Sequence, residues 1–183
     1  MNQASKKLVT LIEVAIMAAI AVVFDKMTIY QAPYGGSVTL SMVPIVMVAL
    51  RRGMWPGIAC GVITGVLQLI TEGYVVHPVQ AILDYPVAYG VLGVAGWVLL
   101  KESQPRNAKM LRSGFGILMA GLSRTLAHFL SGIIFFASMA PKGQSPYLYS
   151  LIYNAAYMIP NMIIAFIITL ILIYTAPQLV HRQ

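Results

Sequence analysis

The amino-acid sequence predicts an all-α integral membrane protein, a six-transmembrane-helix bundle with both termini on the cytoplasmic side. Composition is the first reason: 59% of the 183 residues are apolar and only 9% are charged, whereas a soluble domain carries about 25% charged residues. The second reason is the length of the apolar stretches, and the third is the placement of the basic residues between them. The composition excludes a soluble enzyme, a disordered chain and a conventional nucleic-acid binder.

Six apolar stretches predict the six helices, since a membrane span needs about 20 predominantly apolar residues. The stretch 38–50 is short and contains Pro44, so we expect a span that is extended by residues 35–37, lies obliquely or is broken. The first stretch has some features of a signal peptide, but five more spans follow and we expect it to be retained. Residues 1–183 then form a single membrane domain with helices at about 8–24, 38–50, 54–70, 79–100, 111–139 and 147–175.

The basic residues predict the orientation of the bundle. If the six helices alternate in direction, only Lys26 and Lys142 lie on the side opposite the termini. Cytoplasmic loops carry the excess of Lys and Arg in membrane proteins, so the termini are expected in the cytoplasm. The nine basic residues on that side are Lys6, Lys7, Arg51, Arg52, Lys101, Arg106, Lys109, Arg112 and Arg182.

Motifs for catalysis are missing from the sequence. There is no P-loop, no H-E-x-x-H and no G-x-S-x-G, and Cys60 is the only cysteine. The chain is therefore expected to be a transport or binding protein that uses no cofactor and hydrolyses no ATP itself. An autonomous secondary transporter is the alternative, although we find no internal repeat of the kind such proteins show. An intramembrane hydrolase is a third alternative, but this sequence has no nucleophile motif that would support it.

Small residues at helical spacing predict close packing between helices. Two glycine series, one in the third stretch and one in the fourth, are expected to pack inside the bundle. Ala15 and Ala19 in the first stretch follow the same spacing, and they serve either internal packing or the docking of another membrane protein. The glycines are Gly57, Gly61 and Gly65, and Gly90, Gly93 and Gly96.

Polar residues at membrane depth are costly and are candidates for function. Glu13 is the exception, because it lies near the cytoplasmic end, where it is expected to reach the interface or to pair with Lys6 or Lys7. The others share one level in the outer half of the bilayer, on three different helices. This outer group comprises Asp84, Tyr85, Arg124, His128, Tyr149, Tyr153, Asn154 and Tyr157.

The chemistry of the outer group favours a small-molecule pocket over a purely structural network in which Asp84 pairs with Arg124. Arg124 and His128 share one helical face, since they are four residues apart. A carboxylate accepts two N–H bonds from an amino-heterocycle, and aromatic faces stabilise a cation. The group therefore suits a flat, cationic, nitrogen-rich ligand.

The chain resembles the thiamine-specific substrate-binding S components of energy-coupling factor (ECF) vitamin transporters over essentially its whole length. The residues that carry the resemblance are LIEVAIMAA at 11–19, ALRRG at 49–53, HPVQAILDYP at 77–86, RTLAHFLSG at 124–132 and YSLIYN at 149–154. The resemblance implies a membrane subunit that binds thiamine from outside and docks through Ala15 and Ala19 onto a transmembrane coupling protein with two ATPases.

The resemblance also implies which residues bind the ligand. The family's acidic-Tyr pair falls on Asp84 and Tyr85, with Asp84 one methylene shorter than the glutamate of its best-known members. A family tryptophan corresponds to Phe136, which keeps a ring face and loses an N–H. Separately, the segment 25–37 is expected to be either a plain connector or a lid with Tyr34 or Tyr30 over the ligand. The expected substrate-binding residues are Asp84, Tyr85, His128, Phe136, Tyr149, Asn154 and Tyr34.

Overall fold

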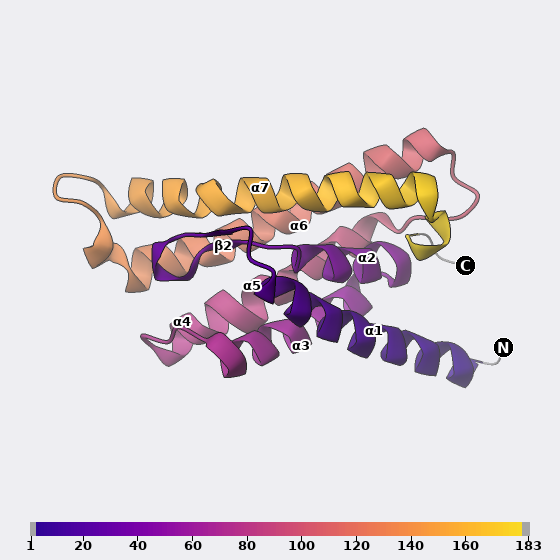
Figure 1. Ribbon diagram of the computed structural model, residues 1–183, viewed down its shortest axis with the longest axis horizontal. Coiled ribbons are helices and arrows are strands. Elements are labelled where there is room, and N and C mark those ends of the chain that lie inside the picture. The colour runs from indigo at the N-terminus through magenta and orange to yellow at the C-terminus, as the bar shows by residue number, and fades with distance from the viewer. Residues whose placement is uncertain (1–2, 181–183) are drawn as a thin grey trace.

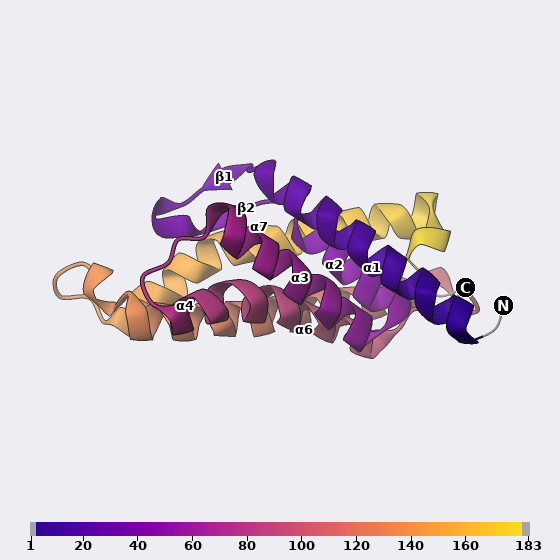
Figure 2. The same cartoon turned by 90° about the horizontal axis from the view of Figure 1, so that it is seen from below.

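The protein is an elongated bundle of helices in the computed structural model, which describes residues 3–180 apart from the side chain of Tyr34 (Figure 1). Both ends of the chain lie at one end of the bundle, which we call the terminal end (Figures 1 and 2). The opposite end carries the loop between α6 and α7, and we call it the loop end. Within the described residues, five helical stretches are long and apolar enough to cross a membrane. They are α1 (Gln3–Lys26), α3 (Met54–Glu72), the interrupted helix Pro78–Val98, α6 (Arg106–Phe135) and α7 (Pro146–Thr175).

The second apolar stretch forms a short helix and an extended segment. α2 (Met42–Arg52) has 11 residues, which at 1.5 Å per residue is about 16 Å, or about half of a bilayer core. The prediction of helix over 38–50 is therefore wrong at its start, because β2 (Ser37–Val38) pairs with β1 (Tyr30–Gln31) in an antiparallel ribbon instead. Pro44 lies in the first turn of α2, the part of a helix where a missing N–H is tolerated.

A side chain from α7 satisfies the extended backbone that continues from β2. Asn161 donates from Nδ2 to the carbonyl oxygen of Ser37 at 2.8 Å, and its Oδ1 accepts from the amide of Thr39 at 3.0 Å. Such backbone is tolerated at membrane depth only where protein provides its hydrogen bonds. The ribbon therefore continues the line of α2 toward the loop end, beside α7 (Figure 1).

The fourth apolar stretch is helical but irregular. Pro86 has no N–H and interrupts the hydrogen-bond ladder, and a wide π-helical turn forms around it. The predicted single helix over 79–100 is thus divided into four parts. These are α4 (Pro78–Ile82), the π-helical turn Leu83–Val87, α5 (Ala88–Gly90) and the 3-10 helix Val91–Val98.

The glycine series lie where α3 meets this irregular helix, which confirms the prediction of internal packing. A Cβ at Gly61 would lie 2.1 Å from the carbonyl oxygen of Tyr89, and one at Gly93 would lie 2.3 Å from the amide nitrogen of Ile58. Only glycine permits the two backbones to approach this closely. The contact fixes the irregular helix against α3 along its length.

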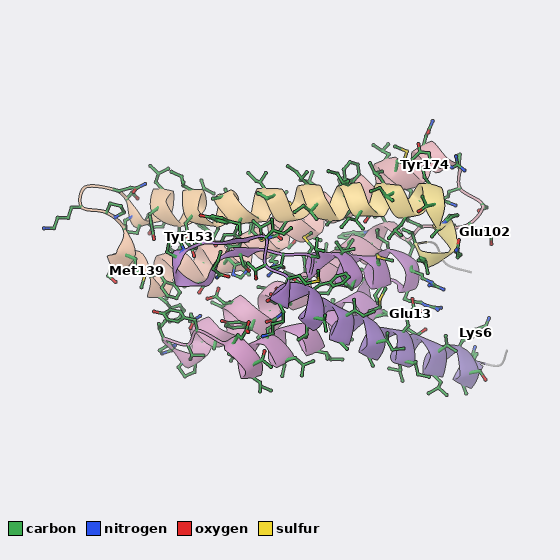
Figure 3. The ribbon with its side chains drawn as sticks, viewed as in Figure 1. Lys6, Glu13, Glu102, Met139, Tyr153 and Tyr174 are labelled. Atoms are coloured by element: carbon green, nitrogen blue, oxygen red, sulfur yellow. The ribbon has the colours of Figure 1, made fainter. Side chains whose placement is uncertain are left out.

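The terminal end holds an ion cluster that the sequence did not predict. Glu13 Oε2 lies 2.5 Å from Nη2 of Arg52, and Glu13 Oε1 lies 3.4 Å from Nη1 of Arg51. The expected pairing with Lys6 or Lys7 is wrong, because α1 packs on α2 and brings Glu13 to the last turn of that helix. Figure 3 shows Glu13 and Lys6 on the part of α1 nearest the terminal end.

The two small residues of α1 are exposed. Ala15 and Ala19 lie on the outer surface, whereas Val14, Ala18 and Ala21 are buried against the bundle. Internal packing therefore uses the neighbouring positions, and the face with Ala15 and Ala19 is free within the described part of the chain.

Candidate functional site

A cavity of about 200 Å³ lies in the half of the bundle toward the loop end. Its walls come from α3, the irregular helix, α6, α7 and the segment that carries the β ribbon. Figure 3 places Tyr153 and Met139, two of the lining residues, toward this end. The site is therefore made from side chains that are far apart in the sequence.

The carboxylate of Asp84 is the best-connected group of the cavity. Its Oδ2 accepts from Nε2 of Gln80 at 2.7 Å and from Oγ of Ser131 at 2.8 Å, and its Oδ1 lies 3.0 Å from Nδ1 of His128. The side chain is 17% exposed. Amide and hydroxyl donors orient a carboxylate without cancelling its charge, so Asp84 keeps a negative charge at the cavity wall.

The hydrogen bonds of His128 indicate a neutral ring. Arg124 Nε donates to Nε2 of His128 at 3.3 Å, so Nε2 is an acceptor and the proton is assigned to Nδ1, which donates to Asp84. The guanidinium carbon of Arg124 also lies 4.0 Å from the ring centre of Tyr89. The imidazole thus lies between the acid and the arginine, and the alternative of a direct Asp84–Arg124 pair is not what the described residues show.

Aromatic rings form a second wall. Tyr149 and Tyr153 stack with ring centres 6.0 Å apart, and Tyr153 meets Tyr157 edge-to-face at 5.7 Å. This confirms the predicted tyrosine stripe on α7. Across the cavity Phe136, at the end of α6, stacks on Tyr74 at 6.3 Å.

Asn154 and Tyr85 are held by local hydrogen bonds. The buried Asn154 donates from Nδ2 to the carbonyl oxygen of Ser150 at 2.8 Å, and its Oδ1 accepts from the hydroxyl of Tyr157. The hydroxyl oxygen of Tyr85 accepts from the amide of Tyr74 at 2.7 Å. Both residues line the cavity with their orientation already fixed.

The segment between α1 and α2 closes one side of the cavity. The hydroxyl of Tyr153 donates to the carbonyl oxygen of Pro33 and accepts from the amide of Gly36 at 3.0 Å. Gln31 and Ser37, on the β ribbon, also line the cavity. The expected role of Tyr34 concerns a side chain outside the described residues, and Tyr30 is 54% exposed and does not line the cavity.

Six of the seven predicted substrate-binding residues line this one cavity. The sequence reasoning missed Gln80 and Ser131, although helical spacing could have revealed them, since they lie four residues before Asp84 and three after His128. No comparable signal pointed to Asp25 or Gln68, which also line the cavity. The six residues brought together are Asp84, Tyr85, His128, Phe136, Tyr149 and Asn154.

The charges around the cavity favour a cation. Three carboxylates, Asp25, Glu72 and Asp84, line it against one cation, Arg124. Glu72 pairs with Lys26, and Asp25 accepts from the hydroxyl of Tyr89 at 3.1 Å. Among the described residues, no group of three or more His, Cys, Asp or Glu side chains could hold a metal ion. The arrangement therefore suits an organic cation with hydrogen-bonding groups and a flat ring.

Three comparisons with known proteins agree with one another. The family model described as thiamine transporter protein matches residues 11–181. The chain is 40% identical to the thiamine transporter ThiT of Bacillus subtilis, over 100% of this chain and 99% of that protein. It is 30% identical to the thiamine transporter ThiT of Lacticaseibacillus paracasei, over 97% and 92% of the two chains. A solved structure of ThiT from Listeria monocytogenes superposes with a TM-score of 0.86 at 27% identity, over 96% of this chain and 99% of that chain.

Proposed function

The chain belongs to the thiamine transporter protein family, and from this premise we propose that it is the membrane subunit that binds thiamine, in the cavity around Asp84. The relatives are named transporters, so the chain is a transport protein of the bacterial cell membrane and not an enzyme. The observation that carries the assignment of the site is the negatively charged Asp84 between aromatic walls, because thiamine combines a cationic thiazolium ring with an aminopyrimidine.

Each part of thiamine has a matching group in the cavity. The carboxylate of Asp84 attracts the positive thiazolium ring and accepts a hydrogen bond from the amino group of the pyrimidine. The rings of Tyr149, Phe136 and Tyr85 provide faces that a desolvated cation favours by about 0.5–2 kcal/mol each. His128 and Asn154, both already oriented by hydrogen bonds, complete the polar wall that recognises the pyrimidine.

Calorimetric titration of the purified chain with thiamine tests the assignment of the ligand. We expect one thiamine per chain, bound more tightly than its analogue oxythiamine, in which an oxygen replaces the amino group. A buried hydrogen bond to a charged group contributes about 1.5–3 kcal/mol, so the loss should be about tenfold to a hundredfold. Equal affinity for the two compounds would contradict recognition of the aminopyrimidine by Asp84.

We further propose that the chain is the S component of an ECF importer and that its exposed Ala15 and Ala19 dock on a transmembrane coupling protein. Small residues at this spacing permit close helix contact, and the sequence has no P-loop of its own. Replacing both alanines with Trp should abolish ATP-driven uptake in vesicles that also contain the coupling protein and two ATPases. Thiamine affinity of the isolated chain should not change.

The same proposal puts six segments across the membrane and the terminal end in the cytoplasm. The concentration of basic residues at the terminal end supports it. Cysteine placed at Ser103 should be protected from a membrane-impermeant maleimide in intact cells, whereas cysteine placed at Lys142 should react. The opposite pattern would reverse the orientation. Thiamine uptake by vesicles that hold this chain alone would favour the autonomous transporter instead.

A further inference from the structure

A second cavity, of about 290 Å³, lies at the terminal end, remote from the thiamine site. It is formed where α6 begins and α7 ends, and Figure 3 shows Glu102 and Tyr174 close to this corner of the bundle. Two of its lining residues are basic and one is acidic. The lining residues are Glu102, Gln104, Arg106, Lys109, Ile173 and Pro177.

Lys109 is the unusual member of this group. It is only 8% exposed, and its ammonium group has no hydrogen-bond or ion-pair partner among the described residues. Glu102, the only acid in the lining, is exposed and makes no ion pair with it in the described part of the chain. The structure thus places an unpaired ammonium group, on a side chain that is otherwise buried, at the wall of the cavity.

The start of α6 adds further positive potential at the same point. The helix has 30 residues, no side-chain cap and no acidic residue in its first turn, so its first amides have free N–H groups and the helix dipole is not compensated. Arg106, the first residue of the helix, stacks its guanidinium 5.1 Å from the ring centre of Tyr174. This contact holds the side chain beside the cavity and leaves its planar N–H groups free for an oxyanion.

From these contacts we infer that the cavity binds the phosphate headgroup of an anionic phospholipid. The ligand needs a negatively charged group with several acceptor oxygens, because the unpaired ammonium of Lys109, the guanidinium of Arg106 and the first amides of α6 all donate. A lipid rather than a free anion fits the position, since the cavity lies at the ends of two membrane helices. Leu111 and Phe115, which are 78% and 55% exposed, lie in the first turns of α6 but face away from Lys109. They offer acyl chains an apolar surface beside the start of the helix and are not part of the cavity wall.

Native mass spectrometry of the full-length chain tests the inference. Phosphatidylglycerol and phosphatidylcholine with identical acyl chains are titrated against the wild type and three variants. We expect the wild type to favour phosphatidylglycerol, and Lys109→Gln to weaken that binding about tenfold, the loss of one charge-assisted contact. Lys101→Gln removes the same charge from an exposed residue that does not line the cavity, and it should change the affinity less than twofold.

Arg106→Gln keeps the inference testable if Lys109→Gln does not fold, because Arg106 is exposed. It should also weaken phosphatidylglycerol binding severalfold. The inference is overturned if the wild type binds the two lipids equally, or if neither cavity variant alters binding. A free anion is the ligand instead if millimolar inorganic phosphate displaces phosphatidylglycerol from the wild type and Lys109→Gln weakens the binding of that phosphate. None of these results depends on thiamine.

Discussion

Two of the carboxylates in the membrane helices, Asp84 and Glu13, have similar exposure and opposite surroundings. Their side chains are 17% and 16% exposed. Asp84 is hydrogen-bonded by an amide, a hydroxyl and a neutral imidazole, and it lines the cavity. Glu13 is bonded by two arginine guanidinium groups at the terminal end.

The partners, more than the burial, determine what each acid can do. Neutral donors orient a carboxylate and leave its charge available to a ligand, whereas two guanidinium groups neutralise it in place. Asp84 is therefore suited to binding a cation, and Glu13 to holding α1 against α2. Matched substitutions at the loop end and the terminal end distinguish these two roles.

The largest expected effect is on thiamine affinity. Asp84→Asn keeps the size of the side chain and removes its charge, so affinity should fall by about tenfold to a hundredfold, the usual contribution of a charge-assisted hydrogen bond. Glu13→Gln makes the same chemical change at the terminal end and should leave affinity within about twofold. Isothermal titration calorimetry measures both variants under the same conditions, and equal losses would contradict the contrast.

The second expected effect is on stability, and here the substitution at Glu13 has the effect. Glu13→Gln leaves Arg51 and Arg52, which are 18% and 19% exposed, without their anion, and unfolding should become easier by about 1.5–3 kcal/mol. Glu102→Gln is the control, since it is an exposed acid near the same end and should change stability by less than about 0.5 kcal/mol. Thermal unfolding in detergent compares the two. A Glu13→Gln variant as stable as the control would mean that the arginines find other partners.

Helical spacing and the lengths of the apolar stretches predicted, from the sequence alone, which polar residues of the loop end lie together. The depth of Asp84, His128 and Asn154 in three helices placed them at one level, and the structure brings them to one cavity. The i,i+4 relation of Arg124 and His128 is confirmed by their hydrogen bond. These features depend on position within a single helix, which a sequence shows directly.

Contacts between segments that are far apart in the chain could not be predicted from the sequence. Glu13 was assigned to lysines near in sequence, but its partners lie about 40 residues away on α2. The extended backbone before α2 needs Asn161 of α7, more than 120 residues away. Neither contact leaves a periodic signal, so only the packed bundle reveals them.

A third expected effect is the contribution of a single aromatic ring of the cavity wall to thiamine affinity, as distinct from its contribution to packing. Phe136→Ala removes a ring that lines the cavity, and thiamine affinity should fall by about twofold to thirtyfold, the range expected for one cation–π face. Phe135→Ala removes the neighbouring ring, which stacks on His77 at 5.0 Å and does not line the cavity. Titration of both variants should show the loss only for Phe136→Ala. Similar losses would assign both rings to general packing of the loop end.

The smallest expected effect concerns closure of the cavity at the loop end. Tyr153→Phe keeps the ring that stacks on Tyr149 and meets Tyr157 edge-to-face, but it removes the hydroxyl that bonds Pro33 and Gly36. An ordinary hydrogen bond contributes about 0.5–1.5 kcal/mol, so thiamine should dissociate about twofold to tenfold faster, while its association changes little.

Stopped-flow measurement of tyrosine or tryptophan fluorescence separates these two rates. Tyr147→Phe is the matched control, because Tyr147 is 64% exposed on the first turn of α7 and does not line the cavity. If the segment between α1 and α2 were a plain connector, the two variants would release thiamine at the same rate. A faster release by Tyr153→Phe alone would mean that this segment holds the ligand in place, so that the loop end opens before thiamine leaves.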